Sequence, residues 1–363
     1  MNTTHQALHQ AIIDGVFPAA ELLVAKDGNL LFHEWAGGAR EGSIFDIASL
    51  TKPVCTATLT LMLIAEGIIK PTDTISQWLS GAKLPVHREI TVQHLLHHTS
   101  GLPAWQPYYR ELPLSMIGTE EGKNVILQEI FHELPEGKLG ETVYSDLGYI
   151  LLGKILEEAG DASLDQLFTT RISRPLNLKD TFFRPMIGEV PKNNEFGKKE
   201  RHRRFAPTQD CPWRHRIVKG EVDDQNAFAL GGIAGHAGLF SIGEDLHTFL
   251  IEFVKCSHGT GNLIPGKTMQ AFFDFSKVPE YRVGEIFLGG WNLPSLQNSA
   301  SGHHFSRRSM GHLAFTGCSI WIDLEKNAWI ILLSNRVHPS NMNEKIKAFR
   351  PQIHDIAMKE FVI

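Results

Sequence analysis

Ser49 and Lys52 are three residues apart, and this spacing could form the nucleophilic centre of a hydrolase. The Ser-x-x-Lys pattern occurs a second time, at Ser80 and Lys83. Ser49 stands shortly before the strongly apolar residues 54–66, so a helix that begins near residue 49 would place Ser49 and Lys52 on one face. Ser80 is followed by glycine and soon by proline, which favour a surface loop. Ser49 is therefore the candidate nucleophile.

The chemistry open to Ser49 and Lys52 is nucleophilic catalysis. The amides and the dipole of a helix N-terminus favour negative charge beside Ser49. A buried Lys52 next to the hydroxyl could lose its proton and act as the base. Taken alone, the pair could equally be an N-cap serine and an exposed lysine. The sequence contains neither G-x-S-x-G nor H-E-x-x-H, so it supports neither an α/β-hydrolase elbow nor a zincin helix.

Tyr144 and Asp146 could supply a second part of the same site. Tyr144-Ser145-Asp146 stands directly before a predicted helix over residues 147–159. A tyrosine hydroxyl close to a lysine ammonium can act as a general base. Taken alone, Tyr144 could equally be a core residue, with Asp146 as the N-cap of the helix.

His312 could supply a third part, a cation or hydrogen-bond donor beside the nucleophile. It lies in the segment 311–317, which leads directly into a predicted strand over residues 319–322. His236 is a rival, but its segment leads toward a predicted helix, and the nearby glycines suggest a tight turn.

The elements that must position these residues form a mixed pattern. Strands are predicted at both ends of the chain, and the central sequence is mostly helical. The predicted strands are 21–26, 30–35, 319–322 and 329–333. The predicted helices are 5–15, 54–66, 90–97, 147–159, 245–255 and 340–361, and residues 186–226 are predicted to form a long loop. The fold class is therefore α+β, an antiparallel sheet of N- and C-terminal strands flanked by helices, with a mostly helical inserted region.

This pattern also predicts the domain organisation. Residues 1–65 and 265–363 would form the sheet domain, and residues 66–264 the helical region with long active-site loops, in one discontinuous catalytic unit. The 363 residues, 42% hydrophobic and 21% charged, suit a soluble globular protein that can bury a sizeable core.

Composition argues against several classes of function. A net charge of −5 argues against a nucleic-acid partner. The four cysteines are scattered without a Cys-x-x-Cys pair, which excludes a disulfide scaffold and argues against a zinc ribbon, so we expect buried, reduced thiols. No apolar run is long enough to predict a membrane span. The first residues show no secretory signal, so a cytoplasmic location is expected, or a periplasmic one if a leader has been removed.

Together and in this order, the three elements resemble the Ser-x-x-Lys, Ser/Tyr-x-Asn and Lys-Thr-Gly motifs of the serine β-lactamase and penicillin-binding protein superfamily. Tyr144 and His312 resemble the class C β-lactamase-related branch, which contains D-peptidases, esterases and muramoyl-alanine amidases. The resemblance covers nearly the whole chain and includes residues 90–103, 229–232 and 238–241. The stretch 206–214 resembles members that act on cell-wall fragments.

The resemblance implies a role for each motif residue. Ser49 would attack a carbonyl carbon and become acylated. Lys52 and Tyr144 would share the role of base, and Tyr144 would pass the proton to the leaving group. The amides of Ser49 and Phe315 would form the oxyanion hole. His312 would hold Tyr144 electrostatically or contact the substrate. The resemblance implies no cofactor and no metal.

Three positions depart from the family pattern. Asp146 stands where asparagine is commoner, and its carboxylate would pair with Lys52 and oppose deprotonation of the lysine. Leu313 replaces a threonine that often helps to bind a substrate carboxylate, and Ala314 replaces a glycine on a strand that must approach the substrate closely. An ester or amide without that carboxylate therefore fits better than a β-lactam, and Thr316 could supply a substitute hydroxyl.

Other aromatic, basic and histidine residues are further candidates. Trp105 could belong to an aromatic wall of the site or pack on the surface. Trp213 and Arg214 could be lid residues that contact the substrate. The basic run 198–204 could be a solvated loop or a lid that attracts an anionic substrate. The histidines at 94, 97 and 98 have metal-like spacing but no evident acidic or cysteine partner, so we expect a helix end packed beneath the active-site loop.

The sequence thus predicts a cofactor-free serine hydrolase that cleaves an ester or amide through an acyl-enzyme on Ser49. Its partner would be a small-molecule or peptide-like substrate, with a cell-wall peptide fragment as one candidate, and no oligomeric state is predicted. Three alternatives stay open. A β-lactamase or D-Ala-D-Ala carboxypeptidase would use the same residues. A non-catalytic module would bind β-lactams or peptidoglycan without turnover. A histidine-based metallohydrolase would not need Ser49.

Overall fold

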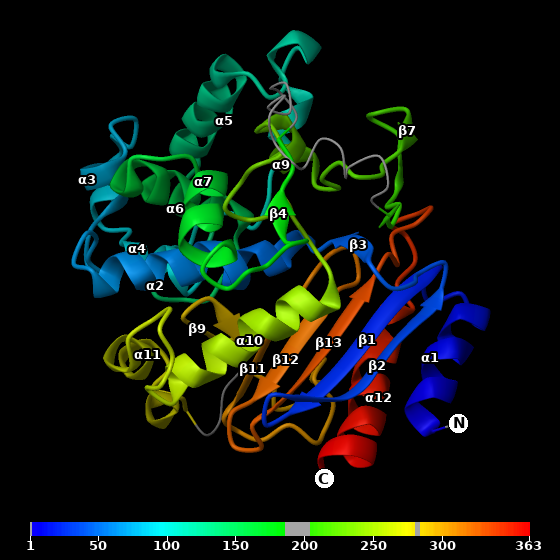
Figure 1. The fold of residues 1–363 in the computed structure, drawn as a ribbon. Coiled ribbons are helices and arrows are strands. Elements are labelled where there is room, and N and C mark those ends of the chain that lie inside the picture. Colours follow the sequence, from blue (N-terminus) through cyan, green and yellow to red (C-terminus); the bar gives the residue numbers. More distant parts are fainter. Residues whose placement is uncertain (1, 186–203, 280–283) are drawn as a thin grey trace.

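A seven-stranded antiparallel sheet organises the computed structural model (Figure 1), which describes residues 2–185, 204–279 and 284–363. The strand order is β2-β1-β13-β12-β11-β10-β9. The strand bounds are β1 Ala19–Lys26, β2 Asn29–Gly37, β9 Phe287–Leu288, β10 Trp291–Asn292, β11 Ser309–Leu313, β12 Ser319–Asp323 and β13 Ala328–Ser334. Strands from the two chain ends therefore share one sheet, and the predicted α+β class is confirmed.

Helices cover both faces of this sheet (Figure 1). α1 (Thr3–Ile13) and α12 (Ile346–Ala357) pack together on one face, and α10 (Gly243–Ser257) lies on the other. β13 is buried along its whole length, which accounts for its unbroken apolar run. The four predicted strands agree with β1, β2, β12 and β13 to within two residues at each end.

The predicted apolar helix is observed as a helical stretch that ends in α2 (Thr58–Ala65), and α6 (Asp146–Gly160) and α11 (Gly266–Phe272) contact it. Another long helix is α5 Glu120–His132. The shorter ones are α3 Ile75–Trp78, α4 Val92–Leu96, α7 Leu164–Phe168 and α9 Gln225–Ala229. Tight 3₁₀ turns cover Ala48–Leu50, Pro85–Arg88, Tyr108–Arg110, Leu114–Met116 and Phe275–Lys277, and wider π-helical turns cover Lys52–Ala57, Thr169–Ser173 and Met358–Val362. The last predicted helix begins at residue 346 rather than 340, because the Arg336 guanidinium binds two carbonyls of the preceding loop.

A second, four-stranded sheet joins segments that are far apart in the chain. Its order is β4-β8-β3-β5, with bounds β3 Ser43–Asp46, β4 Phe182–Phe183, β5 Arg204–Phe205 and β8 Leu239–Ser241. β6 (Asp210–Cys211) and β7 (Arg216–Ile217) form a separate hairpin. The prediction of one loop over 186–226 is therefore wrong from residue 204 onward, because short strands pair there. Residues 186–203, with most of the predicted basic run, lie outside the described residues.

One helical stretch in the described ranges, Ala48–Ala65, is long and apolar enough to cross a membrane. It is 78% buried inside the protein, which is the burial of a core helix. All four cysteines are buried and free, as expected. The predicted division at residues 65 and 265 stays a prediction, although α10, which it assigns to the helical region, lies on the large sheet.

Candidate active site

Ser49 lies where β3 passes into the buried helical stretch. β3 ends at Asp46, and a tight turn begins at Ala48, so the predicted start of the helix is close to the observed one. Ala48 has a φ of +42°, a left-handed conformation that is uncommon for a residue with a side chain. The Asp46 carboxylate supports this turn by accepting a hydrogen bond from the Ala48 amide at 2.8 Å. The chain thus presents Ser49 at a locally constrained position.

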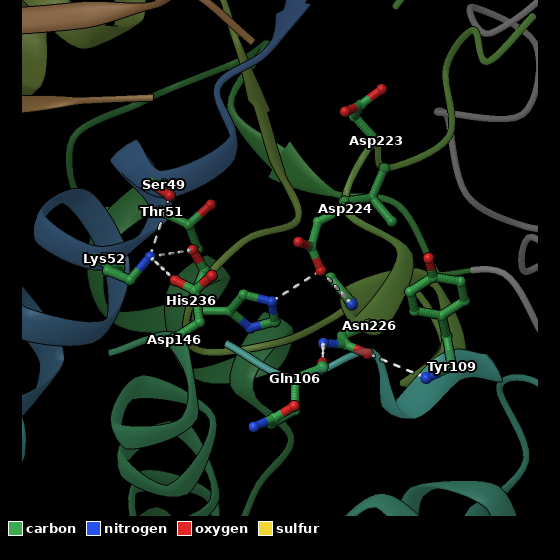
Figure 2. Close-up of polar contacts among 12 residues, drawn as sticks. Ser49, Thr51, Lys52, Gln106, Tyr109, Asp146, Asp223, Asp224, Asn226 and His236 are labelled. Atoms are coloured by element: carbon green, nitrogen blue, oxygen red, sulfur yellow. Dashed lines mark hydrogen bonds and ion pairs between the residues drawn. The ribbon is translucent and has the colours of Figure 1, made fainter. Parts of the chain in front are cut away.

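Lys52 is fully buried and has three polar contacts around its ammonium group (Figure 2). Its Nζ lies 3.1 Å from Ser49 Oγ, 2.7 Å from Asp146 Oδ1 and 3.2 Å from the His236 carbonyl oxygen. Burial acts to lower the pKa of Lys52, but Asp146 and Tyr144 outweigh it, so that pKa is raised. The expected ion pair with Asp146 is present. The Asp146 carboxylate favours the protonated lysine, and the role of Lys52 as a base stays a prediction.

Tyr144 is packed beneath this group. The Lys52 ammonium lies 4.8 Å from the centre of its ring. Burial raises the pKa of Tyr144, and the hydrogen bonds with Lys52 and Ser49 offset this only in part. Tyr144 therefore rests as a neutral phenol, which can donate a proton.

His312 lies on β11 with its ring centre 5.9 Å from that of Tyr144. Its Nδ1 lies 2.8 Å from the Leu313 carbonyl oxygen, so Nδ1 carries the ring proton and Nε2 has the free lone pair. Burial, with a further contribution from Lys52, lowers the pKa of His312 to about 3. A pKa this low favours a neutral ring whose Nε2 can accept a hydrogen bond, and the role of His312 beside Tyr144 or the substrate stays a prediction.

A cleft of about 610 Å³ opens at Ser49. Among the predicted residues, the cleft is lined by Ser49, Trp105, Asp146, Trp213 and Phe315. Both residues of the predicted oxyanion hole thus border the same space. The other lining residues are Ala48, Tyr109, Arg110, Gln209, Cys211, Pro212, Asp223, Asp224, Gln225, His236, Ala237 and Asn341.

Three predicted substrate-binding residues do not line this cleft. Arg214 is buried and donates to the carbonyls of Val222 and Asp223 at 2.7 Å, so its guanidinium fastens the loop from inside. Thr316 is also buried, and its hydroxyl donates to the Asp46 carbonyl at 2.9 Å. Ala314 is 5% exposed. Polar partners or burial hold these side chains away from the cleft lining, and their contact with a substrate stays a prediction.

Two buried polar residues hold the site together: the sequence indicates His98 only as part of a packed helix end, and it gives no sign of Asn226. His98 is buried, accepts a hydrogen bond from the Ser145 amide at 3.0 Å and packs its ring 4.4 Å from Tyr144. Asn226 donates to the Gln106 carbonyl and accepts from the Tyr109 amide, so it fixes the aromatic segment at the cleft (Figure 2). Asparagine and histidine are seldom buried without a hydrogen-bond partner. Their residue types were the signal in the sequence for such a positioning role.

His236 was set aside as a rival third motif, yet the structure places it in the cleft. Its Nε2 lies 2.9 Å from Asp224 Oδ1. Asp146, Asp224 and His236 each offer one ligand atom within 4.8 Å of the others, which is a spacing that could hold a metal ion. However, Asp146 is already paired with Lys52, and Asp224 with His236. The prediction that the site uses no metal stays a prediction.

Comparisons with known proteins identify the family of the chain. A model of the beta-lactamase family matches residues 5–352. A protein of Escherichia coli O157:H7 with the provisional name D-alanyl-D-alanine carboxypeptidase is 28% identical over 353 residues, which covers 90% of this chain and 80% of the relative. The solved structure of EstCE1, described as a hydrolase with promiscuous acyltransferase activity, is 19% identical, covers 98% of this chain and 97% of its own, and has a TM-score of 0.73.

A solved class C β-lactamase has the same fold. It is 15% identical, covers 97% of this chain and 95% of its own, and has a TM-score of 0.70. The family match spans nearly all of the sequence, including the segments that carry Ser49, Tyr144 and His312. The chain therefore belongs to the beta-lactamase family and is a serine hydrolase.

Proposed function

We propose that this hydrolase cleaves an ester or amide through an acyl-enzyme on Ser49. The observation that carries the proposal is the position of Lys52 Nζ, 3.1 Å from Ser49 Oγ and 2.7 Å from Asp146 Oδ1. A hydroxyl within hydrogen-bond distance of a buried lysine has a proton acceptor at hand once the lysine passes on one of its own protons.

The proton movements follow from the resting states of the three groups. As Ser49 Oγ attacks the carbonyl carbon, three transfers occur together: Tyr144 gives its phenolic proton to the leaving group, Lys52 gives one of its protons to Tyr144, and the Ser49 proton passes to Lys52. Lys52 carries the same charge before and after, so its raised pKa is compatible with this relay. The amides of Ser49 and Phe315 would stabilise the oxyanion, and water then releases the acyl group by the reverse transfers.

The third motif supports a substrate that needs no carboxylate clamp there. His312 is neutral and Thr316 is occupied by the Asp46 carbonyl, so neither offers a cation or a free hydroxyl. The aromatic residues Trp105, Tyr109 and Trp213 line the cleft instead. A small ester, or an amide of a cell-wall peptide fragment, fits these walls better than a β-lactam or a D-Ala-D-Ala terminus.

The second candidate is a D-Ala-D-Ala carboxypeptidase or β-lactamase, which the provisional name of the Escherichia coli relative supports. Steady-state hydrolysis separates the two. We expect turnover of a p-nitrophenyl ester and no release of D-alanine from an acyl-D-Ala-D-Ala peptide or opening of a chromogenic cephalosporin. Efficient turnover of the peptide or cephalosporin with none of the ester would reverse the assignment. A stable adduct without turnover on any substrate would instead indicate a binding module.

A further inference from the structure

Residues 235–239 run along the first turns of the helical stretch that carries Ser49 and Lys52. Three hydrogen bonds join the two segments: Thr56 Oγ1 donates to the Gly235 carbonyl at 2.6 Å, Lys52 Nζ donates to the His236 carbonyl at 3.2 Å, and the Leu239 amide donates to Thr51 Oγ1 at 3.1 Å. A Cβ at Gly235 would lie 2.1 Å from the Tyr149 carbonyl oxygen, so only glycine allows this approach to α6. The position of the His236 carbonyl is therefore defined by close packing.

The His236 side chain makes a fourth interaction, with a residue in a different part of the chain. The residue is 1% exposed, and its Nε2 lies 2.9 Å from Asp224 Oδ1. Burial acts to raise the pKa of Asp224, but His236, the Ala227 amide and Lys52 together lower it, so Asp224 is ionised and Nε2–H is the donor. Asp224 Oδ1 also accepts from the Ala227 amide at 2.7 Å, which fixes the carboxylate at the start of α9.

The neighbouring residue, Asp223, ties the same segment to the other side of the nucleophile. Its amide donates to Asp46 Oδ2 at 2.6 Å, and Asp46 Oδ1 accepts from the Ala48 amide at 2.8 Å. Residues 223–224 thus reach Ala48 through Asp46 and Lys52 through His236. Ala48 and Lys52 lie on either side of Ser49 in the sequence. Both are held by residues 223–224, which lie about 175 positions further along the chain.

We propose that the Asp224–His236 pair is a positioning element that keeps Lys52 Nζ within reach of Ser49 Oγ. This inference rests on the proposed function. The Lys52 ammonium donates to Ser49 Oγ and to the His236 carbonyl, and it forms an ion pair with Asp146. If the carbonyl moves, the ammonium loses one of the acceptors that set its orientation, and a misplacement of about 1 Å can cost on the order of a hundredfold in rate. Asp224 and His236 act through Lys52, so neither is a catalytic residue.

The test compares His236→Phe with His236→Gln. Phenylalanine keeps a buried ring but cannot donate to Asp224, whereas glutamine can donate through its side-chain amide. The readout is the rate of covalent labelling by a fluorophosphonate, followed by intact mass and resolved into the maximal rate and the half-saturating concentration. We expect His236→Phe to lower the maximal rate at least about tenfold with an unchanged half-saturating concentration, and His236→Gln to recover it to within about threefold of wild type.

Asp224→Asn provides a second variant in case His236→Phe fails to fold. Asparagine can still accept from Ala227 and from His236 but carries no charge, so a positioning role predicts labelling within about threefold of wild type. The matched control is His303→Phe, because His303 and Asp355 form another histidine–aspartate pair, 2.7 Å apart, in which the His303 side chain is 82% exposed. The control should label at the wild-type rate.

Each outcome decides the inference. A folded His236→Phe that labels like the control overturns it, and so does a His236→Gln that is as slow as His236→Phe. An Asp224→Asn that loses labelling while it stays folded also overturns it, because the charge and not the hydrogen bond would then be needed. Failure of the wild type to label on Ser49 would contradict the proposed function instead, so the two failures are distinguishable.

Discussion

The Lys52 ammonium lies 2.7 Å from Asp146 Oδ1, closer than its 3.1 Å approach to Ser49 Oγ. The lysine is fully buried, and the carboxylate is the partner that keeps it protonated there. Asp146 begins α6 and stands two residues after Tyr144. The start of one helix therefore favours the protonated state of a lysine on another, and the role proposed for Ser49 depends on that state.

Asp146→Asn should keep the fold and keep or raise the rate of acylation. The asparagine oxygen can still accept from Lys52, but the loss of the negative charge lowers the pKa of the lysine and eases its proton transfers. The rise of labelling rate with pH should therefore move to lower pH. Fluorophosphonate labelling of both proteins across a pH series measures this. A folded variant that no longer acylates would show that the carboxylate itself is required.

Lys52→Met should abolish acylation, with a loss of at least about a thousandfold, because the proton of Ser49 then has no acceptor beside it. The chain offers a matched control in its second Ser-x-x-Lys pair. Ser80 and Lys83 are both exposed, so Lys83→Met should label at the wild-type rate. Equal loss in both variants would mean that the effect is not specific to the site.

Thr316→Val should change stability and not substrate preference. The substitution removes the hydroxyl that donates to the buried Asp46 carbonyl, which should cost about 1–2 kcal/mol in the free energy of unfolding. The ratio of ester to peptide hydrolysis should stay at its wild-type value, because the side chain does not reach the cleft. Urea unfolding and two-substrate kinetics test the two parts. A changed ratio of ester to peptide hydrolysis would show that Thr316 does contact the substrate.

His312→Gln should make the protein less sensitive to acid. The pKa of His312 in the folded protein is about 3, below that of an unfolded histidine, so the unfolded state binds more protons and stability falls as the pH drops below the unfolded value. Between pH 7 and pH 5 the wild type should lose about 2 kcal/mol more than the variant. Equal losses in denaturant titrations at the two pH values would mean that His312 is not buried as a neutral ring.

The features predictable from the sequence are those encoded by local pattern. The Ser49 motif, α6 after Tyr144 and the strands at both chain ends follow from apolar periodicity and from residues that start or stop helices. The pairing of Lys52 with Asp146 followed from their charges once both were placed in one site.

The features that escaped prediction depend on distant contacts. β3 and β8 are four and three residues long, too short for a periodic signal, yet their pairing brings His236 to Lys52. The sequence also does not show whether a polar side chain points into the cleft or into the protein interior. Arg214 and Thr316 carry groups that suit a substrate, but carbonyl oxygens inside the protein bind both. The local sequence does not show which acceptor a side-chain hydrogen-bond donor will bind.

The most direct test of the central claim is intact mass after incubation with a fluorophosphonate, with wild type and Ser49→Ala side by side. We expect one adduct on the wild type and none on the variant, with the modified peptide containing Ser49. No adduct on the wild type, or equal labelling of the variant, would contradict Ser49 as the nucleophile.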